Sequence, residues 1–74
     1  MSRTKQTRTS AKMLEEKAAL LADVSGKKCI VVTAVRGCSV HFDGVRHDFT
    51  TFTAAWDWMD EVEQPYFQAW LAAI

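Results

Sequence analysis

The chain has 74 residues, nine of them basic and nine acidic, so it has room for one small domain and carries a formal net charge of zero. No apolar run approaches the ~20 residues that a membrane-spanning helix needs, and Cys29 and Cys38 do not resemble the disulfide framework of a small secreted domain. We therefore expect a soluble cytoplasmic domain with reduced thiols. Its stability margin should be thin, and small domains of this kind usually need disulfides, a metal or a partner chain to stabilise them.

The first nine residues, MSRTKQTRT, are polar and basic and show no apolar periodicity, so residues 1–9 are predicted to form a disordered arm. Ser2 to Thr7 resembles the amino terminus of the tail of the third core histone, with the first residue replaced, whereas Arg8 to Ser10 depart from that pattern. The resemblance implies that Arg3 and Lys5 could be presented to a reader of such tails. A solvated basic arm is the alternative interpretation.

A helix is predicted from Ser10 to Gly26, because apolar residues recur at helical spacing between polar ones. Ser10 is the expected N-cap and Gly26 the expected C-terminal stop. The apolar stripe is narrow and consists of Met13, Leu14, Ala18, Leu21 and Val24. A helix this short is marginal alone, so it should pack on a sheet or on a second chain.

A β-branched run, residues 28–36, and two further extended runs, residues 38–42 and 45–49, predict a three-stranded antiparallel meander. Asp43-Gly44 is the signature of a two-residue hairpin turn, which fixes the register of the second and third strands. The predicted neighbours are Phe42 and Val45, His41 and Arg46, Val40 and His47, Ser39 and Asp48, and Cys38 and Phe49.

The first strand is predicted to be apolar on both faces. A second two-residue turn at Arg36-Gly37 would place Val35 opposite Cys38. In that register Ile30 and Val32 lie on the sheet face that is polar elsewhere. An exposed edge strand of this kind is a liability in a monomer, so we expect either the N-terminal helix or another chain to cover it.

Residues 49–53 lead from the third strand into a helix with a threonine as its cap. Its apolar stripe consists of Phe52, Ala55, Trp56, Met59 and Val62. Pro65 is expected to kink or break it near Gln64 and to open a short last helix that is apolar nearly all round. Residues 10–74 are thus predicted to form a single α+β domain, with an N-terminal helix, a three-stranded antiparallel meander and a C-terminal helix broken near Pro65.

Catalytic and metal-binding sites are not expected. Cys38 and His41 have a ligand-like spacing, but residues three apart in a strand point to opposite faces. Cys38 and His47 share a face, yet that face is the predicted core, where a thiol is inert. Ser39, His41 and Asp48 share the other face without a cleft to exclude water. We therefore expect neither an enzyme nor a cofactor.

Protein recognition is the function that the sequence favours, because aromatic side chains ringed by acids are typical of a contact surface. The predicted contact residues are Trp58, Tyr66, Phe67 and Trp70 near the C-terminus and Ile30 and Val32 on the first strand. We expect these two groups to join a homodimer. The alternative, that all of these rings belong to the core, stays open at this point.

The size and element pattern of the chain resemble those of small phage-encoded proteins, including anti-CRISPR-like inhibitors of host machinery. This resemblance implies an inhibitor or regulator of a host protein complex. The alternative function is a nucleic-acid-associated regulator, in which the basic residues at the start of the chain contact phosphates. Those residues are Arg3, Lys5, Arg8 and Lys12.

Overall fold

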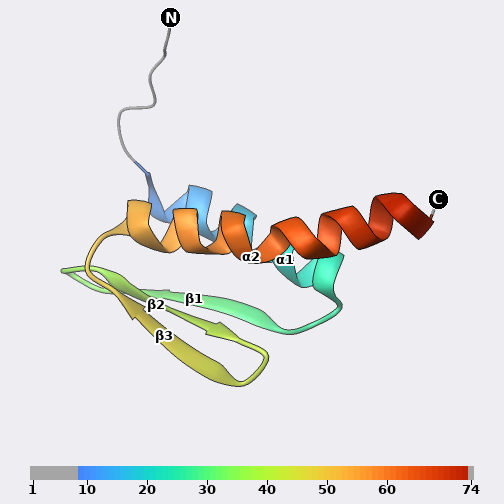
Figure 1. Cartoon of the computed structure of the whole chain (residues 1–74). Coiled ribbons are helices and arrows are strands. Elements are labelled where there is room, and N and C mark those ends of the chain that lie inside the picture. Colours follow the sequence, from blue (N-terminus) through green and yellow to red (C-terminus); the bar gives the residue numbers. More distant parts are fainter. Residues whose placement is uncertain (1–8, 74) are drawn as a thin grey trace, which may run out of the picture.

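The computed structural model describes residues 9–73 and contains two helices and one antiparallel sheet. The elements follow in the order α1 (Ala11–Ser25), β1 (Cys29–Thr33), β2 (Cys38–Phe42), β3 (Val45–Phe49) and α2 (Phe52–Ala73). Both helices cover the same face of the β1-β2-β3 sheet, which gives a two-layer α+β arrangement (Figure 1). The predicted fold class is confirmed. The arm lies outside the described residues except for Thr9.

Helix α1 begins and ends at the predicted caps. The Ser10 hydroxyl accepts a hydrogen bond from the Met13 N–H at 3.2 Å, which satisfies one of the free donors of the first turn. Gly26 adopts a left-handed conformation with φ of 72° and donates its N–H to the Ala22 carbonyl at 2.9 Å. The helix is therefore defined at both ends by local interactions.

The register of β2 and β3 is the predicted one, with Phe42 opposite Val45 and Cys38 opposite Phe49. The register of β1 and β2 differs from the prediction by two residues, because Thr33 rather than Val35 lies opposite Cys38. A longer loop, closed by a hydrogen bond from the Ala34 N–H to the Gly37 carbonyl at 3.1 Å, replaces the expected two-residue turn. A shift of two residues keeps every side chain on its predicted face.

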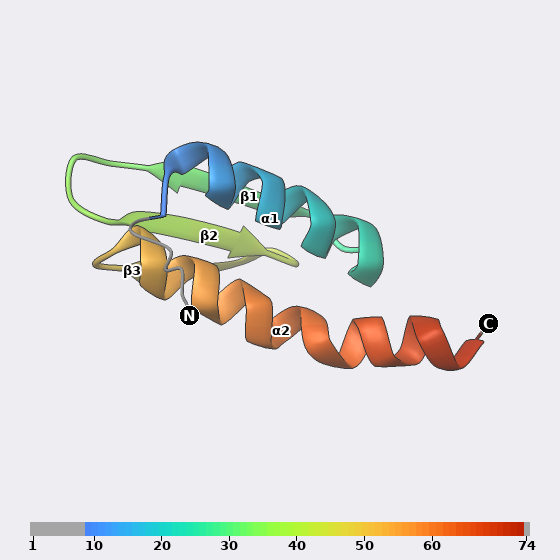
Figure 2. The same cartoon turned by 90° about the horizontal axis from the view of Figure 1, so that it is seen from above.

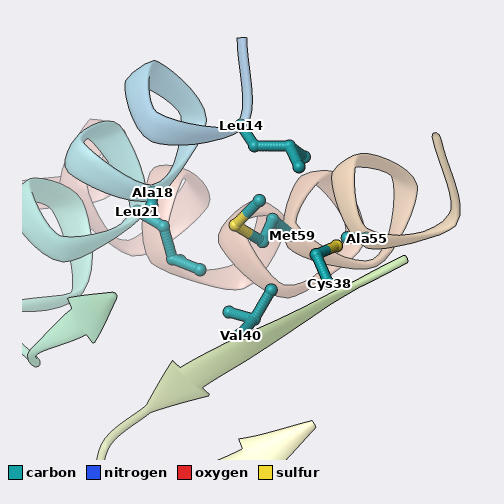
Figure 3. Close-up of a cluster of buried hydrophobic side chains, with 7 residues drawn as sticks. All are labelled: Leu14, Ala18, Leu21, Cys38, Val40, Ala55 and Met59. Carbon is teal, nitrogen blue, oxygen red and sulfur yellow. The ribbon is translucent and has the colours of Figure 1, made fainter. Parts of the chain in front are cut away.

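The core lies between the sheet and both helices (Figure 3). Val40 and Cys38 point from the central strand toward the helices, and Met59 points back from α2. The buried apolar residues are Leu14, Ala18, Leu21, Cys38, Val40, Ala55 and Met59. Ile30 and Val32 lie on the opposite face of the sheet, as predicted, and neither helix covers them, since their side chains are 47% and 52% exposed.

The prediction of a break near Pro65 is wrong. Helix α2 is continuous from Phe52 to Ala73 and contains Pro65. Proline inside a helix removes one hydrogen bond and crowds the preceding turn, at a cost of about 3 kcal/mol. Ring contacts on both sides of the proline oppose that cost. The Phe42 ring lies edge-on to Trp58 at 6.2 Å and to Tyr66 at 6.4 Å, so the turns before and after Pro65 pack on the same strand.

Alanine substitutions at Gly37 and Gly44 should separate backbone strain from steric conflict. Both glycines have positive φ, 80° and 82°, which costs an alanine about 1–2 kcal/mol. A Cβ at Gly44 meets open space, whereas a Cβ at Gly37 collides with the Phe49 carbonyl oxygen. Gly37→Ala should therefore lower the free energy of unfolding in urea clearly more than Gly44→Ala. Equal losses of unfolding free energy would show that the loop before β2 can move to relieve the collision at no further cost.

Candidate functional site

A buried cluster of charges joins the two helices. The Lys17 ammonium of α1 contacts Asp60 Oδ1 at 2.7 Å and Glu63 Oε2 at 2.9 Å, both on α2, and lies 4.3 Å from the centre of the Trp56 ring. Lys17 is 8% exposed and Glu63 only 4%. Because each charge meets an opposite charge or a ring face, the cluster is tolerated at a depth where single charges are rare.

Two opposing effects act on the pKa of Lys17. Desolvation by burial lowers it, while the hydrogen bonds and charges of Asp60 and Glu63 raise it, and the net result is a pKa above the ordinary value. The ammonium therefore stays charged, and its donors are directed to protein carboxylates. Glu63 Oε1 is buried and has no hydrogen-bond partner among the described residues. The cluster thus holds α1 against α2, and we assign it no ligand.

Three connected hollows follow the seam between α1 and α2, which run side by side in the same direction (Figure 2). Their volumes are about 310, 290 and 270 Å³ from the N-terminal end to the C-terminal end. Neighbouring hollows share Met13 and Trp56 at one junction and Leu20 at the next. The last hollow is closed by Phe67 and Trp70. The seam is therefore a mainly apolar furrow on the surface of the helical layer.

The structure gives the four C-terminal contact candidates two different places. Trp58 packs on the sheet, with its ring 4.4 Å from that of His47 and 5.7 Å from that of Phe49. Tyr66 packs on Phe42, and both Trp58 and Tyr66 are half-buried against the core. These two rings close the core. Trp58 and Tyr66 thus pack against the core, and their predicted role in a partner contact stays a prediction.

Phe67 and Trp70 instead belong to the furrow and to the end of α2. Phe67 is half-buried, Trp70 is 56% exposed and the adjoining Leu71 is 60% exposed. Residues 64–73 contain no charged side chain, and this segment extends past the end of the sheet (Figure 1). The C-terminal part of α2 therefore presents apolar surface to solvent without charges to solvate it.

The uncovered face of the sheet carries a polar network beside the apolar edge strand. Asp48 accepts hydrogen bonds from Ser39 Oγ at 2.6 Å and from Arg46 Nε at 2.8 Å. These two hydrogen bonds, that of Ser39 first, hold the pKa of Asp48 below its ordinary value. Strand β3 thus has charged residues on its open edge, whereas β1 consists of Cys-Ile-Val-Val-Thr and has none.

Both thiols and the His47 ring take part in packing. Burial raises the pKa of both thiols, Cys29 and Cys38, which favours the protonated, unreactive form. The Cys38 thiol lies 4.0 Å from the Thr51 carbonyl, and His47 stacks on Trp58. Within residues 9–73, His, Cys, Asp and Glu side chains form no group of three suited to a metal ion. No described helix is long and apolar enough to cross a membrane.

The proposed nucleic-acid contacts fall mostly outside the described residues, which leaves Arg3, Lys5 and Arg8 without a structural account. Lys12 is described and is exposed on the first turn of α1. Ahead of that turn, the Thr9 hydroxyl hydrogen-bonds to that of Thr53 at 3.1 Å, so Thr9 lies beside the first turn of α2.

Comparisons with protein-family models, with curated proteins and with solved structures give no match for this chain. The surfaces themselves are therefore the basis for a functional proposal. Of the six contact residues that the sequence indicated, Trp70, Ile30 and Val32 are exposed and the other three are half-buried. It gave no weight to the furrow or to the Lys17 cluster. Lys17 shares a flank of α1 with Met13, and Glu63 shares a flank of α2 with Trp56. The opposite charges of Lys17 and Glu63 on these flanks were the signal in the sequence from which the contact between the helices could have been inferred.

A double-mutant cycle on Lys17 and Glu63 should show strong coupling. Lys17→Met leaves Glu63 buried without its cation and should cost about 3–5 kcal/mol of unfolding free energy. Glu63→Leu should cost less, because Asp60 still pairs with Lys17. The double variant should recover most of the loss, as measured by urea unfolding. Lys27→Met is the control, since its 3.5 Å pair with Asp43 is exposed and worth at most about 1 kcal/mol. Additive losses would contradict the assigned coupling.

The contribution of Lys17 should disappear at alkaline pH. Because its folded-state pKa is raised, the stabilisation is complete below the unfolded value of 10.5 and is lost as the pH rises through the higher folded value. The difference in unfolding free energy between the wild type and Lys17→Met should therefore be constant near neutral pH and narrow above about pH 10.5. A difference that widens there would reverse the assigned direction.

Proposed function

We propose that this protein is a non-enzymatic protein-binding module that acts as a homodimer. The observation that carries the proposal is the placement of exposed apolar side chains on two uncharged segments, strand β1 and the end of α2. These segments belong to different layers of the domain, since the helices cover one face of the sheet and Ile30 and Val32 lie on the other. One surface is therefore available for a second copy and one for a different partner.

The edge of β1 is the surface that suits a second copy. Antiparallel pairing of two β1 strands about Val31 would place Ile30 of one copy beside Val32 of the other, so that both pairs of exposed side chains cover each other. A charge or a proline on an edge strand opposes such pairing, and β1 has neither along its length. Pairing at β3 would bring Arg46 and Asp48 to the contact.

The end of α2 is the surface that suits a different protein. Trp70 and Leu71 are exposed next to the hollow that Leu20, Val24 and Phe67 line, and tryptophan is enriched among residues that dominate binding energy. An inhibitor or regulator of a host protein complex is one form of this proposal, and it rests on the likeness of size and pattern. The free thiols of Cys29 and Cys38 support a reducing compartment such as the cytoplasm.

The nucleic-acid alternative has less support among the described residues. Acids predominate on the exposed surface of the two helices, where they would repel a phosphate backbone. The exposed acids are Glu15, Glu16, Asp23, Asp57 and Glu61. The alternative therefore depends on the arm itself, and deletion of residues 1–9 is its direct test.

Charge placed on the β1 edge should abolish self-association. Val32→Lys places a cation beside Ile30 of the other copy, in a contact that is otherwise uncharged, so sedimentation equilibrium should show a dimer for the wild type and a monomer for the variant. Val45→Lys is the matched control, because Val45 on β3 is 55% exposed and Val32 is 52% exposed. A wild-type monomer at every concentration, or an equal effect of the control, would refute the β1 dimer.

A further inference from the structure

We propose that the furrow between α1 and α2 binds a cationic amphipathic helix of another protein. This docking rests on the proposed protein-binding function and specifies the chemistry of the partner. Helix-in-groove recognition needs an apolar channel of helical length, anchor sites at helical spacing and a rim whose charge complements the ligand. The furrow has all three features.

The apolar floor has the spacing of a helix-packing seam. Met13, Leu20 and Val24 line it from α1, and Trp56, Phe67 and Trp70 line it from α2. Neighbouring positions are separated by 7 and 4 residues in α1 and by 11 and 3 residues in α2, which are sums of three and four, the spacing that receives side chains of a neighbouring helix. From Met13 to Val24 the floor is roughly 17 Å long at 1.5 Å per residue, enough for three turns of a bound helix.

Each hollow carries one exposed acid at its rim. Asp57 lines the first hollow, Glu16 the middle one and Asp23 the last. The lysine that lines the middle hollow, Lys17, has its charge directed to the two carboxylates of α2 and so does not oppose a cation. Arginine and lysine on the flanks of a bound helix could reach these acids while their aliphatic stems cover the apolar floor.

The same charges argue against two other occupants. A second copy would bring its own acidic helical layer to this one, with repulsion between like charges. Residues 1–8 of the chain, MSRTKQTR, are basic but contain a single apolar residue, so they lack the stripe that the floor requires. A partner with both properties, a cationic and amphipathic helix, matches the floor and the rim together.

The experiment measures binding of a designed peptide of about five helical turns, roughly 18 residues, by fluorescence anisotropy at physiological salt. The peptide carries leucines at spacings of three and four residues and lysines elsewhere. Its two controls are an analogue with glutamate in place of lysine and a scrambled peptide of the same composition. The expected result is binding of the cationic peptide at least tenfold tighter than either control.

Two sets of substitutions with equal charge change locate the site. The furrow set, Glu16→Gln, Asp23→Asn and Asp57→Asn, should weaken binding about tenfold. The control set removes three exposed acids that line none of the hollows, namely Glu15→Gln, Asp43→Asn and Glu61→Gln, and should change binding less than twofold. Trp70→Ala, at an exposed position, should weaken binding without a change in the unfolding midpoint.

The outcomes separate this inference from the general proposal. Equal binding of the acidic analogue, equal effects of the two sets, or no peptide binding would overturn the cationic-helix site. Sedimentation of the same samples reports independently on the β1 dimer, so that dimer can persist when the furrow fails. A change in self-association on Trp70→Ala would also overturn the inference, because the occupant would then be a second copy.

Discussion

Burial of one ammonium group between the two helices is the constraint on which the rest of the structure depends. Lys17 lies where water is largely excluded, so its charge must be met by the protein, and α2 supplies Asp60 and Glu63 from positions 43 and 46 residues further along the chain. These contacts at 2.7 and 2.9 Å are satisfied in one alignment of the helices. The cluster therefore sets the direction and the longitudinal register of α1 against α2.

The exposed end of α2 and the acidic furrow both follow from that register. The helices begin at the same level, as the Thr9–Thr53 hydrogen bond shows, but α1 has 15 residues and α2 has 22. The last turns of α2 then extend beyond α1 (Figure 2), and Trp70 lies at the end of the furrow with 56% of its surface exposed. Among the acids that do not pair with Lys17, Glu16, Asp23 and Asp57 line the furrow. The unequal helix lengths, in the register that the Lys17 cluster holds, thus account for the exposed aromatic end of α2.

Local chemistry made the order of the elements, the caps and the β2–β3 register predictable, since glycine, serine and Asp43-Gly44 impose them within a few residues. Features that depend on tertiary contacts were not predictable. Pro65 stays helical because Phe42 packs on rings both before and after it. The separation of Trp58, which closes the core, from Trp70, which lies in solvent, depends on how far α2 extends over the sheet. No periodicity in the sequence indicates how far α2 extends over the sheet.

The two proposed contacts are compatible within one assembly. Antiparallel pairing of two β1 edges relates the copies by an axis perpendicular to the sheet, so both helical layers lie on the same side of the combined sheet. Two acidic furrows would then face the same direction, separated by the two α1 helices. A partner that presents two cationic helices could occupy both, and the second binding event would benefit from a high effective concentration. Dimerisation through the uncharged edge would in this way strengthen recognition by the furrow, without any contact between the two surfaces.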